Sequence, residues 1–183
     1  MTLSRLLAFL VALALFPAAA QAHTTIIEPV GSHFPYQQWV DEARVPTPEM
    51  VIVVIEGDDA CLEQNGGCTA PDEGAIWVEP SRIVGRRPRA MFLHELGHNE
   101  DHAVLPAWMR ERYQKIMGLT GAWFQPEAGW FSPNEWFAET WAECAVKPHL
   151  PERATLGIGP IFGQEPMGGP AAHNAACRML AKL

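Results

Sequence analysis

The sequence predicts an α+β fold in which a small sheet packs against helices. This prediction depends on the order of the elements, since two β-branched runs precede residue 80 and four helical patterns follow it. A length of 183 residues suits one domain with its own hydrophobic core. No repeat and no shift in composition divides the chain. We therefore expect a single domain over residues 23–183, preceded by a signal peptide over residues 1–22.

Two strands are predicted in the first half of the chain. Met50–Glu56 (MVIVVIE) is a β-branched run of strand length, which is typical of a buried strand. Ala75–Glu79 (AIWVE) is a second short strand, and the polar segment Gly57–Gly74 between them predicts a loop with two cysteines. Residues 23–48 are rich in proline and aromatic residues and lack a helical period, so we expect an extended, loop-rich segment there.

Four helices are predicted in the rest of the chain. Pro88–Val104 begins with a proline, which suits the first turn, and a second helix runs from Pro106 to Met117 and ends at Gly118. A third helix begins after Ser132, the expected N-cap, and runs to Val146. The last helix is predicted over Ala171–Leu180, after a segment rich in glycine and proline.

The N-terminus has the pattern of a secretory signal. Arg5 precedes an apolar run of eleven residues, Leu6–Phe16, which is too short to span a bilayer. Ala20-Gln21-Ala22 fits the small-x-small cleavage pattern, so the mature chain would begin at His23. A membrane anchor is the alternative. We expect a secreted protein without stable membrane association after cleavage.

Composition and charge exclude some classes of function. Hydrophobic residues make up 48% of the chain and charged residues 19%, which is ordinary for a globular protein. The net charge is −8, and the one basic cluster is the short stretch Arg86–Arg89. We therefore expect no binding to nucleic acid.

The four cysteines predict two disulfides, because an even number of cysteines in an exported chain is typical of oxidised pairs. Three pairings are possible. We favour Cys61–Cys68, which would close a glycine-containing turn, and Cys144–Cys177, which would tie a helix to the C-terminal segment. Free buried thiols are the alternative. A cysteine zinc site is not expected, because no C-x-x-C pair occurs.

The chemistry-bearing motif is H-E-x-x-H at His94-Glu95-Leu96-Gly97-His98. Residues four apart lie on one face of a helix, about 6 Å apart along the axis, so two imidazoles can converge on one metal ion. Glu95 is turned aside from both histidines and can act as the base on a metal-activated water. Two solvated helix histidines are the alternative interpretation.

A catalytic zinc site needs a third protein ligand, and two residues compete for that position. His102 lies on the same face as His94 but about 12 Å along the axis, too far for one straight helix to bring it to the same ion. Glu135 opens a helix whose acidic and alanine positions share a face. That face is odd to bury unless it meets a cation. The alternatives are a solvated acidic face, or a capping box formed by Ser132 and Glu135.

Together, H-E-L-G-H and the downstream E-x-x-A-E resemble the glutamate-ligand zinc metallopeptidases, the gluzincins. The stretch E-W-F-A-E-T-W is most similar to the anthrax lethal factor type, and the resemblance covers about residues 90–145. It implies a zincin-like fold, with a small sheet packed on the H-E-x-x-H helix and on a second, ligand-bearing helix. It also implies one Zn²⁺ held by His94, His98 and Glu135, with Glu139 orienting a ligand histidine. Asp101 can do the same for the other histidine.

One position departs from that pattern. The resemblance would place an oxyanion-stabilising tyrosine seven residues before Glu135, where this chain has Ala128. The candidates for that role are Tyr113, His102, His149 and His173.

The function that these motifs predict is hydrolysis of a peptide or protein substrate by a zinc metallopeptidase. A non-catalytic, zinc-bearing binding module is one alternative, although such a module would have no need of Glu95. A copper oxidase that uses an N-terminal His23 is another, since imidazole suits copper.

Overall fold

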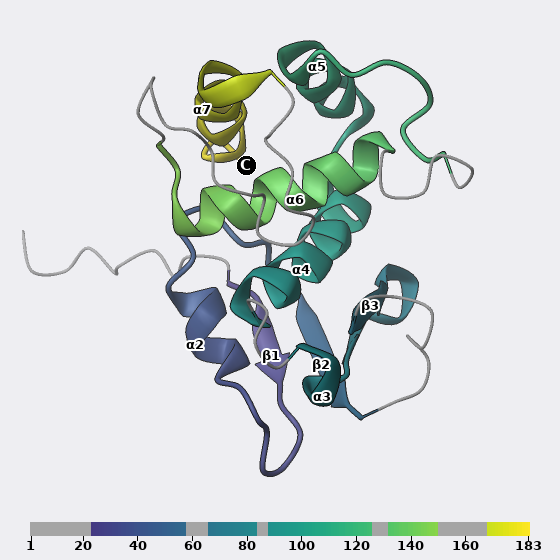
Figure 1. The fold of residues 1–183 in the computed structure, drawn as a ribbon, viewed down its shortest axis with the longest axis vertical. Helices are drawn as coiled ribbons and strands as arrows, with labels where there is room; N and C mark the ends of the chain where they lie inside the picture. The colour runs from purple at the N-terminus through teal and green to yellow at the C-terminus, as the bar shows by residue number, and fades with distance from the viewer. Residues whose placement is uncertain (1–22, 58–65, 84–87, 126–131, 150–167) are drawn as a thin grey trace, which may run out of the picture.

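The computed structural model describes residues 23–57, 66–83, 88–125, 132–149 and 168–183. The predicted α+β layout is confirmed in its coarse form, because one four-stranded sheet lies at one end of the molecule and helices stack above it (Figure 1). The predicted signal peptide and Cys61 lie outside the described residues. None of the described helices combines the length and the apolar character that crossing a bilayer requires.

The sheet is mixed, with strand order β1-β2-β4-β3. Strand β1 pairs in parallel with β2, and β2 pairs in parallel with β4, whereas β3 runs antiparallel to β4 at the edge. The strands are β1 (Thr25–Ile27), β2 (Val51–Glu56), β3 (Gly67–Ala70) and β4 (Ala75–Val78).

The strand predictions for β2 and β4 are confirmed, but β2 is not buried on both faces as we expected. Ile52 and Val54 point into the core, whereas Val51 and Val53 are 57% and 38% exposed. Among the described elements, helices cover one face of this sheet, so a continuous β-branched run serves as a half-buried strand.

Strands β1 and β3 and the short helix α2 lie where extended or loop-rich segments were predicted, and the short helix α3 lies where no element was predicted. Strand β1 has three residues, too few to show a period, and it is held by pairing with β2. Strand β3 contains a glycine and lies in a segment whose sequence predicts a turn, yet it pairs with β4. The short helices are α2 (Tyr36–Asp41) and α3 (Pro80–Ile83).

The four predicted helices are confirmed. They are α4 (Pro88–Val104), α5 (Ala107–Met117), α6 (Pro133–Val146) and α7 (Gly169–Leu180). Helix α4 lies between the sheet and α6, and α5 and α7 lie beyond α6 (Figure 1). Ser132 precedes α6 in an extended conformation, but its side chain makes no capping hydrogen bond. The alternative of a Ser132–Glu135 capping box is therefore wrong.

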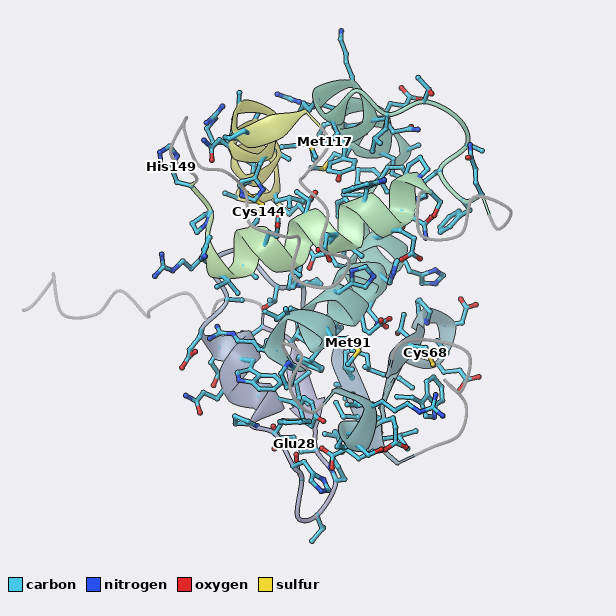
Figure 2. The ribbon with its side chains drawn as sticks, viewed as in Figure 1. Glu28, Cys68, Met91, Met117, Cys144 and His149 are labelled. Carbon is cyan, nitrogen blue, oxygen red and sulfur yellow. A yellow bond between two sulfur atoms is a disulfide. The ribbon has the colours of Figure 1, made fainter. Side chains whose placement is uncertain are left out.

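The predicted disulfide between Cys144 and Cys177 is confirmed, and it ties α6 to α7. Cys68, in the edge strand β3, is also disulfide-bonded. The partner predicted for it, Cys61, is outside the described residues. The labelled Cys144 and Cys68 lie in different parts of the molecule, the first among the helices and the second at the sheet (Figure 2).

A glycine sets how closely the two central helices approach. A Cβ atom added at Gly97 of α4 would lie 3.0 Å from the Cα atom and 3.1 Å from the carbonyl oxygen of Ala138 on α6. It would also lie 3.3 Å from the Cβ atom of Trp141. Backbone atoms cannot swing aside as a long side chain can, so any larger residue at position 97 must push the helices apart.

We expect Gly97→Ala to lower the free energy of unfolding by about 1–3 kcal/mol, the usual cost of overpacking a core. The sign is informative, because the same substitution at an open helical position is stabilising by about 1 kcal/mol. Urea unfolding followed by circular dichroism, with a chelator present, measures the change. A higher unfolding midpoint for Gly97→Ala would contradict the close helix crossing.

Candidate metal centre

The H-E-x-x-H residues lie on the side of α4 that faces α6. His94 is 1% exposed, and the side chain of His98, one turn later, is 13% exposed. Glu135 lies in the first turn of α6 with its side chain 20% exposed. The helix crossing at Gly97 and Ala138 therefore brings these residues together although they come from separate elements.

The three side chains converge on one point. The Nε2 atoms of His94 and His98 are 3.1 Å apart. The carboxylate of Glu135 reaches both rings, with Oε2 3.2 Å from His94 Nε2 and Oε1 3.4 Å from His98 Nε2. One ligand atom from each of these residues lies within 4.8 Å of the others, as a shared metal ion requires.

The chemistry of these donors fits a cation. The Nε2 atoms of His94 and His98 face each other, so they cannot both carry a hydrogen atom. Either one shared proton or a metal ion must therefore lie between them. Burial alone would lower the pKa of His94, but its hydrogen bonds with Glu135 and Glu139 outweigh burial and raise it. Burial alone would raise the pKa of Glu135, but the two histidines hold it well below its usual range. The cluster therefore favours positive charge at its centre.

Glu139, one turn after Glu135, contacts the other nitrogen of the same ring. Its Oε2 lies 3.3 Å from His94 Nδ1, and both residues are buried. A carboxylate there fixes the orientation of a histidine whose other nitrogen binds metal. The contact predicted for Glu139 with a candidate ligand is thus present.

Glu95 differs from its neighbours in having no hydrogen bond or ion pair among the described residues. It is 8% exposed and lies beside the cluster, where its charge interacts with His94, His98 and Glu135. Burial raises the pKa of its carboxyl group, the attraction of the two histidines offsetting part of that rise. No oxygen of Glu95 is among the fully buried side-chain atoms that lack a partner in the described residues, so the carboxylate still meets solvent beside the cluster.

Asp101 has partners other than the histidine predicted for it. Its Oδ1 accepts a hydrogen bond of 2.8 Å from Arg110 Nε, and its Oδ2 accepts one of 2.7 Å from Trp123 Nε1. The Arg110 guanidinium also lies over the Trp123 ring, 5.7 Å from its centroid. Asp101 therefore holds the segment after α5 against α4. These two contacts could not be predicted from the sequence, because neither Arg110 nor Trp123 lies at a helical spacing from Asp101.

His102 lies at the surface, where its Nε2 is 2.9 Å from Asp72 Oδ1. It takes no part in the cluster, as the length of a straight helix predicted. Another contact was not expected: Asn99 donates a 2.5 Å hydrogen bond to Thr69 and so fastens the edge strand β3 to α4 beside the histidines.

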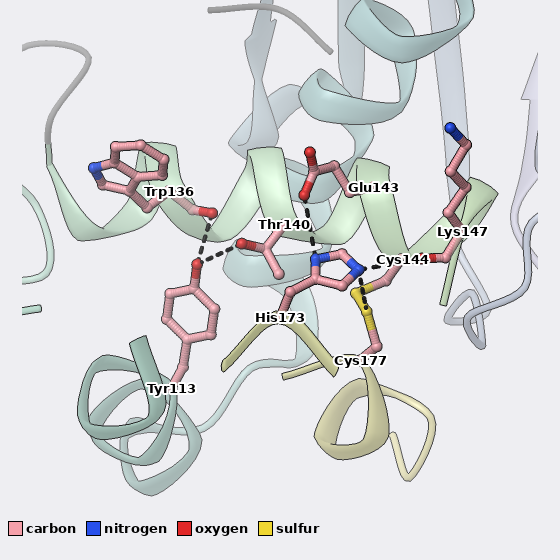
Figure 3. Close-up of a disulfide and its surroundings, with 8 residues drawn as sticks. All are labelled: Tyr113, Trp136, Thr140, Glu143, Cys144, Lys147, His173 and Cys177. Atoms are coloured by element: carbon pink, nitrogen blue, oxygen red, sulfur yellow. Dashed lines mark hydrogen bonds and ion pairs between the residues drawn. A yellow bond between two sulfur atoms is a disulfide. The ribbon is translucent and has the colours of Figure 1, made fainter. Parts of the chain in front are cut away.

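None of the residues considered for the oxyanion role contacts the cluster. Tyr113 is fully buried, and its hydroxyl lies 2.7 Å from the Trp136 carbonyl and 2.8 Å from Thr140 Oγ1 (Figure 3). His173 lies against the disulfide of α6 and α7. His149 is exposed, and Ala128 is outside the described residues.

His23 lies apart from the cluster, with its Nε2 2.8 Å from Asp41 Oδ1. It belongs to neither of the two groups of candidate metal ligands found in the described residues. His23 and Asp41 line a groove of ≈ 660 Å³ that also includes Arg44 and Glu100 but none of the clustered histidines. The candidate metal centre is therefore identified by the convergence of His94, His98 and Glu135, and not by the size of a groove.

Comparison of the chain with models of known protein families, with curated proteins and with solved structures found no match.

We expect His94→Ala and His98→Ala to abolish binding of a divalent metal ion, and Glu135→Ala to weaken it strongly, because each removes one of the converging donors. Titration calorimetry with Zn²⁺ measures the affinity. His102→Ala is the matched control, since it removes an exposed histidine from the same helix and should leave the affinity unchanged. Full zinc retention in both His94→Ala and His98→Ala would show that the cluster is not a metal site.

We expect Glu139→Gln to weaken metal binding by about 10–100-fold, the range typical for loss of a carboxylate that orients a ligand histidine. The substitution keeps the volume of the side chain, so a change in affinity reports on its charge and hydrogen bond. Glu143→Gln, one turn further along α6, is the control in the oxidised protein. Equal affinities for the two variants would contradict this role of Glu139.

Proposed function

We propose that the chain is a secreted zinc-dependent peptidase in which His94, His98 and Glu135 hold the metal and Glu95 is the general base. The observation that carries this proposal is the convergence of two imidazoles and one carboxylate from two helices, beside the Glu95 carboxylate, which has no hydrogen-bond partner among the described residues. A site that only needed to bind metal would gain nothing from burying Glu95.

Zinc is the metal that suits this donor set best. Two histidine nitrogens and one glutamate oxygen are the protein ligands of a common class of catalytic zinc site, which leaves one position for water or substrate. A site of carboxylates and carbonyls would favour magnesium or calcium instead. The sequence resemblance to gluzincins points to the same metal.

When bound, zinc supplies Lewis acidity and lowers the pKa of a water molecule in the site. The protein residues do the rest. The Glu95 carboxylate accepts a proton from the attacking water as the oxygen bonds to the scissile carbonyl carbon. Glu95 then delivers that proton to the leaving nitrogen, so the products are a carboxylate and an amine. Glu139 keeps the His94 ring in place during the reaction.

A peptide is the substrate class that the surroundings favour. Strand β3 is at the edge of the sheet, and the Asn99–Thr69 hydrogen bond fixes it next to α4. Within the described part of the chain no strand pairs with the outer edge of β3, so an extended peptide could pair there and gain backbone hydrogen bonds irrespective of its sequence. That pairing would lay a backbone amide near Glu95.

The predicted export of the chain belongs to the same proposal. The Cys144–Cys177 disulfide fits an oxidising compartment. The signal pattern over residues 1–22 would direct the chain there.

We expect zinc-loaded protein to cleave members of a peptide library, and Glu95→Gln to lower the rate by at least 10²–10⁴-fold, the typical contribution of general acid–base catalysis. Zinc affinity should survive in Glu95→Gln, since the base is not a ligand. Mass spectrometry of the products gives the rates, and His102→Ala is the active control. Cleavage by Glu95→Gln at the full rate would remove Glu95 from the reaction. No cleavage of any peptide by the unmodified, zinc-loaded chain would favour the binding-module alternative.

A further inference from the structure

A buried histidine lies against the disulfide that joins α6 and α7. His173 is fully buried, and its Nε2 is 3.2 Å from Cys177 Sγ and 3.1 Å from the carbonyl oxygen of Lys147. Its Nδ1 is 3.2 Å from Glu143 Oε2 (Figure 3). One ring nitrogen thus faces the sulfur atoms and the other faces a carboxylate.

This arrangement repeats the one at the first cluster. Glu139 and Glu143 are one turn apart on α6, and each has Oε2 near the Nδ1 of a buried histidine, at 3.3 Å for His94 and 3.2 Å for His173, although only the first pair has the geometry of a hydrogen bond. In both cases Nε2 points at a group of metal-ligating atoms. A carboxylate behind a histidine is the usual support of a metal ligand.

The ligand atoms in front of His173 are the two sulfurs. Cys144, Cys177 and His173 each have a ligand atom within 4.8 Å of the other two, and all three residues are buried. Two thiolates and one imidazole form a zinc-type donor set, with His173 and Cys177 one turn apart on α7 and Cys144 on α6. The N–S distance of 3.2 Å already approaches what a shared ion needs, so only the two sulfur atoms must separate.

We propose that the dithiol form of Cys144 and Cys177, together with His173, is a second zinc site. The disulfide takes up two electrons and two protons from a dithiol reductant to give two thiols, and the reductant becomes a disulfide. Binding of Zn²⁺ then displaces one proton from each thiol. A newly made chain carries the same two thiols before oxidation, so the site does not depend on a reductant reaching a buried bond.

His173 changes tautomer between the two forms. In the disulfide form Nε2 must carry the proton to donate to the Lys147 carbonyl. In the zinc form Nε2 must present its lone pair, and the proton moves to Nδ1. This atom lies 3.2 Å from Glu143 Oε2 without a hydrogen bond in the disulfide form, and after a small rotation of the ring it can donate one there. Helix α6 stays linked to α7 in both forms, once by a covalent bond and once by a metal.

Cobalt tests the proposal, because a thiolate bound to Co²⁺ gives a charge-transfer band in the near ultraviolet that histidine and glutamate ligands lack. The oxidised chain should bind Co²⁺ without this band. After reduction by dithiothreitol and its removal without oxygen, the chain should bind one more ion per molecule and show the band. If the reduced chain binds no further ion and shows no band, the proposal is wrong.

Variants distinguish this site from other thiols. Cys144→Ser retains Cys61 and Cys68, so a band that persisted in the reduced variant at full strength would come from those residues and would overturn the proposal. His173→Gln should bind the further ion more than about 10–100-fold more weakly, and Glu143→Gln within that range. Full affinity in His173→Gln would remove the histidine from the site.

Two further measurements distinguish loss of the second metal site from loss of folding and from metal binding at the His94–His98–Glu135 cluster. Far-ultraviolet circular dichroism of each reduced variant reports whether the helices persist, and Cys177→Ser serves in place of His173→Gln if that variant fails to fold. In a His94→Ala background the reduced chain should still bind one Co²⁺ with the thiolate band. This outcome holds whether or not the first cluster is catalytic.

Discussion

The candidate centre depends on the close crossing of α4 and α6 at Gly97. That glycine lies three residues after His94 and directly before His98, and the residue it touches, Ala138, lies between Glu135 and Glu139. The contact that sets the distance between the helices therefore lies in the middle of the residues that must meet. A wider crossing would move the carboxylates away from the imidazoles, and no change of rotamer restores several contacts at once. The contact that packs α4 against α6 therefore also sets the geometry of the candidate metal ligands.

Helix α6 buries an acidic face because histidines oppose it. Glu135, Glu139 and Glu143 recur at four-residue spacing, and each contacts a histidine of another helix. Buried carboxylates are costly unless they are paired or hydrogen-bonded, so such a stripe would be destabilising against an apolar neighbour. The alanines between the glutamates let the backbones approach. The result is a helix that anchors one histidine of the candidate metal centre and a second one at the disulfide.

The long helices and the cluster of His94, His98 and Glu135 could be predicted from the sequence for the same reason. Both follow from the spacing of residues that are close together in the chain. His94, His98 and the glutamates of α6 each follow a helical period, and prolines and glycines mark the helix ends. The edge strand β3 and the short β1 escaped prediction because pairing with other strands, rather than their own residues, keeps them extended. Asp101 escaped for a related reason. Its partners, Arg110 and Trp123, follow the end of α4, so only the tertiary fold brings them near.

The candidate centre is formed by packing in advance of any metal, and this has an energetic consequence. Two imidazoles and three carboxylates, that of Glu95 among them, are held close together by the core around them, which places like charges in a largely buried region. The folded chain bears that cost before a metal arrives. A ligand that binds only the folded form adds RT ln(1 + [L]/Kd), about 2.7 kcal/mol at a hundred times Kd, so the metal would offset it. The Cys144–Cys177 disulfide, near the other end of α6, also stabilises the folded chain, because it restricts the unfolded chain. It holds the ligand-bearing helix α6 against α7 without any metal.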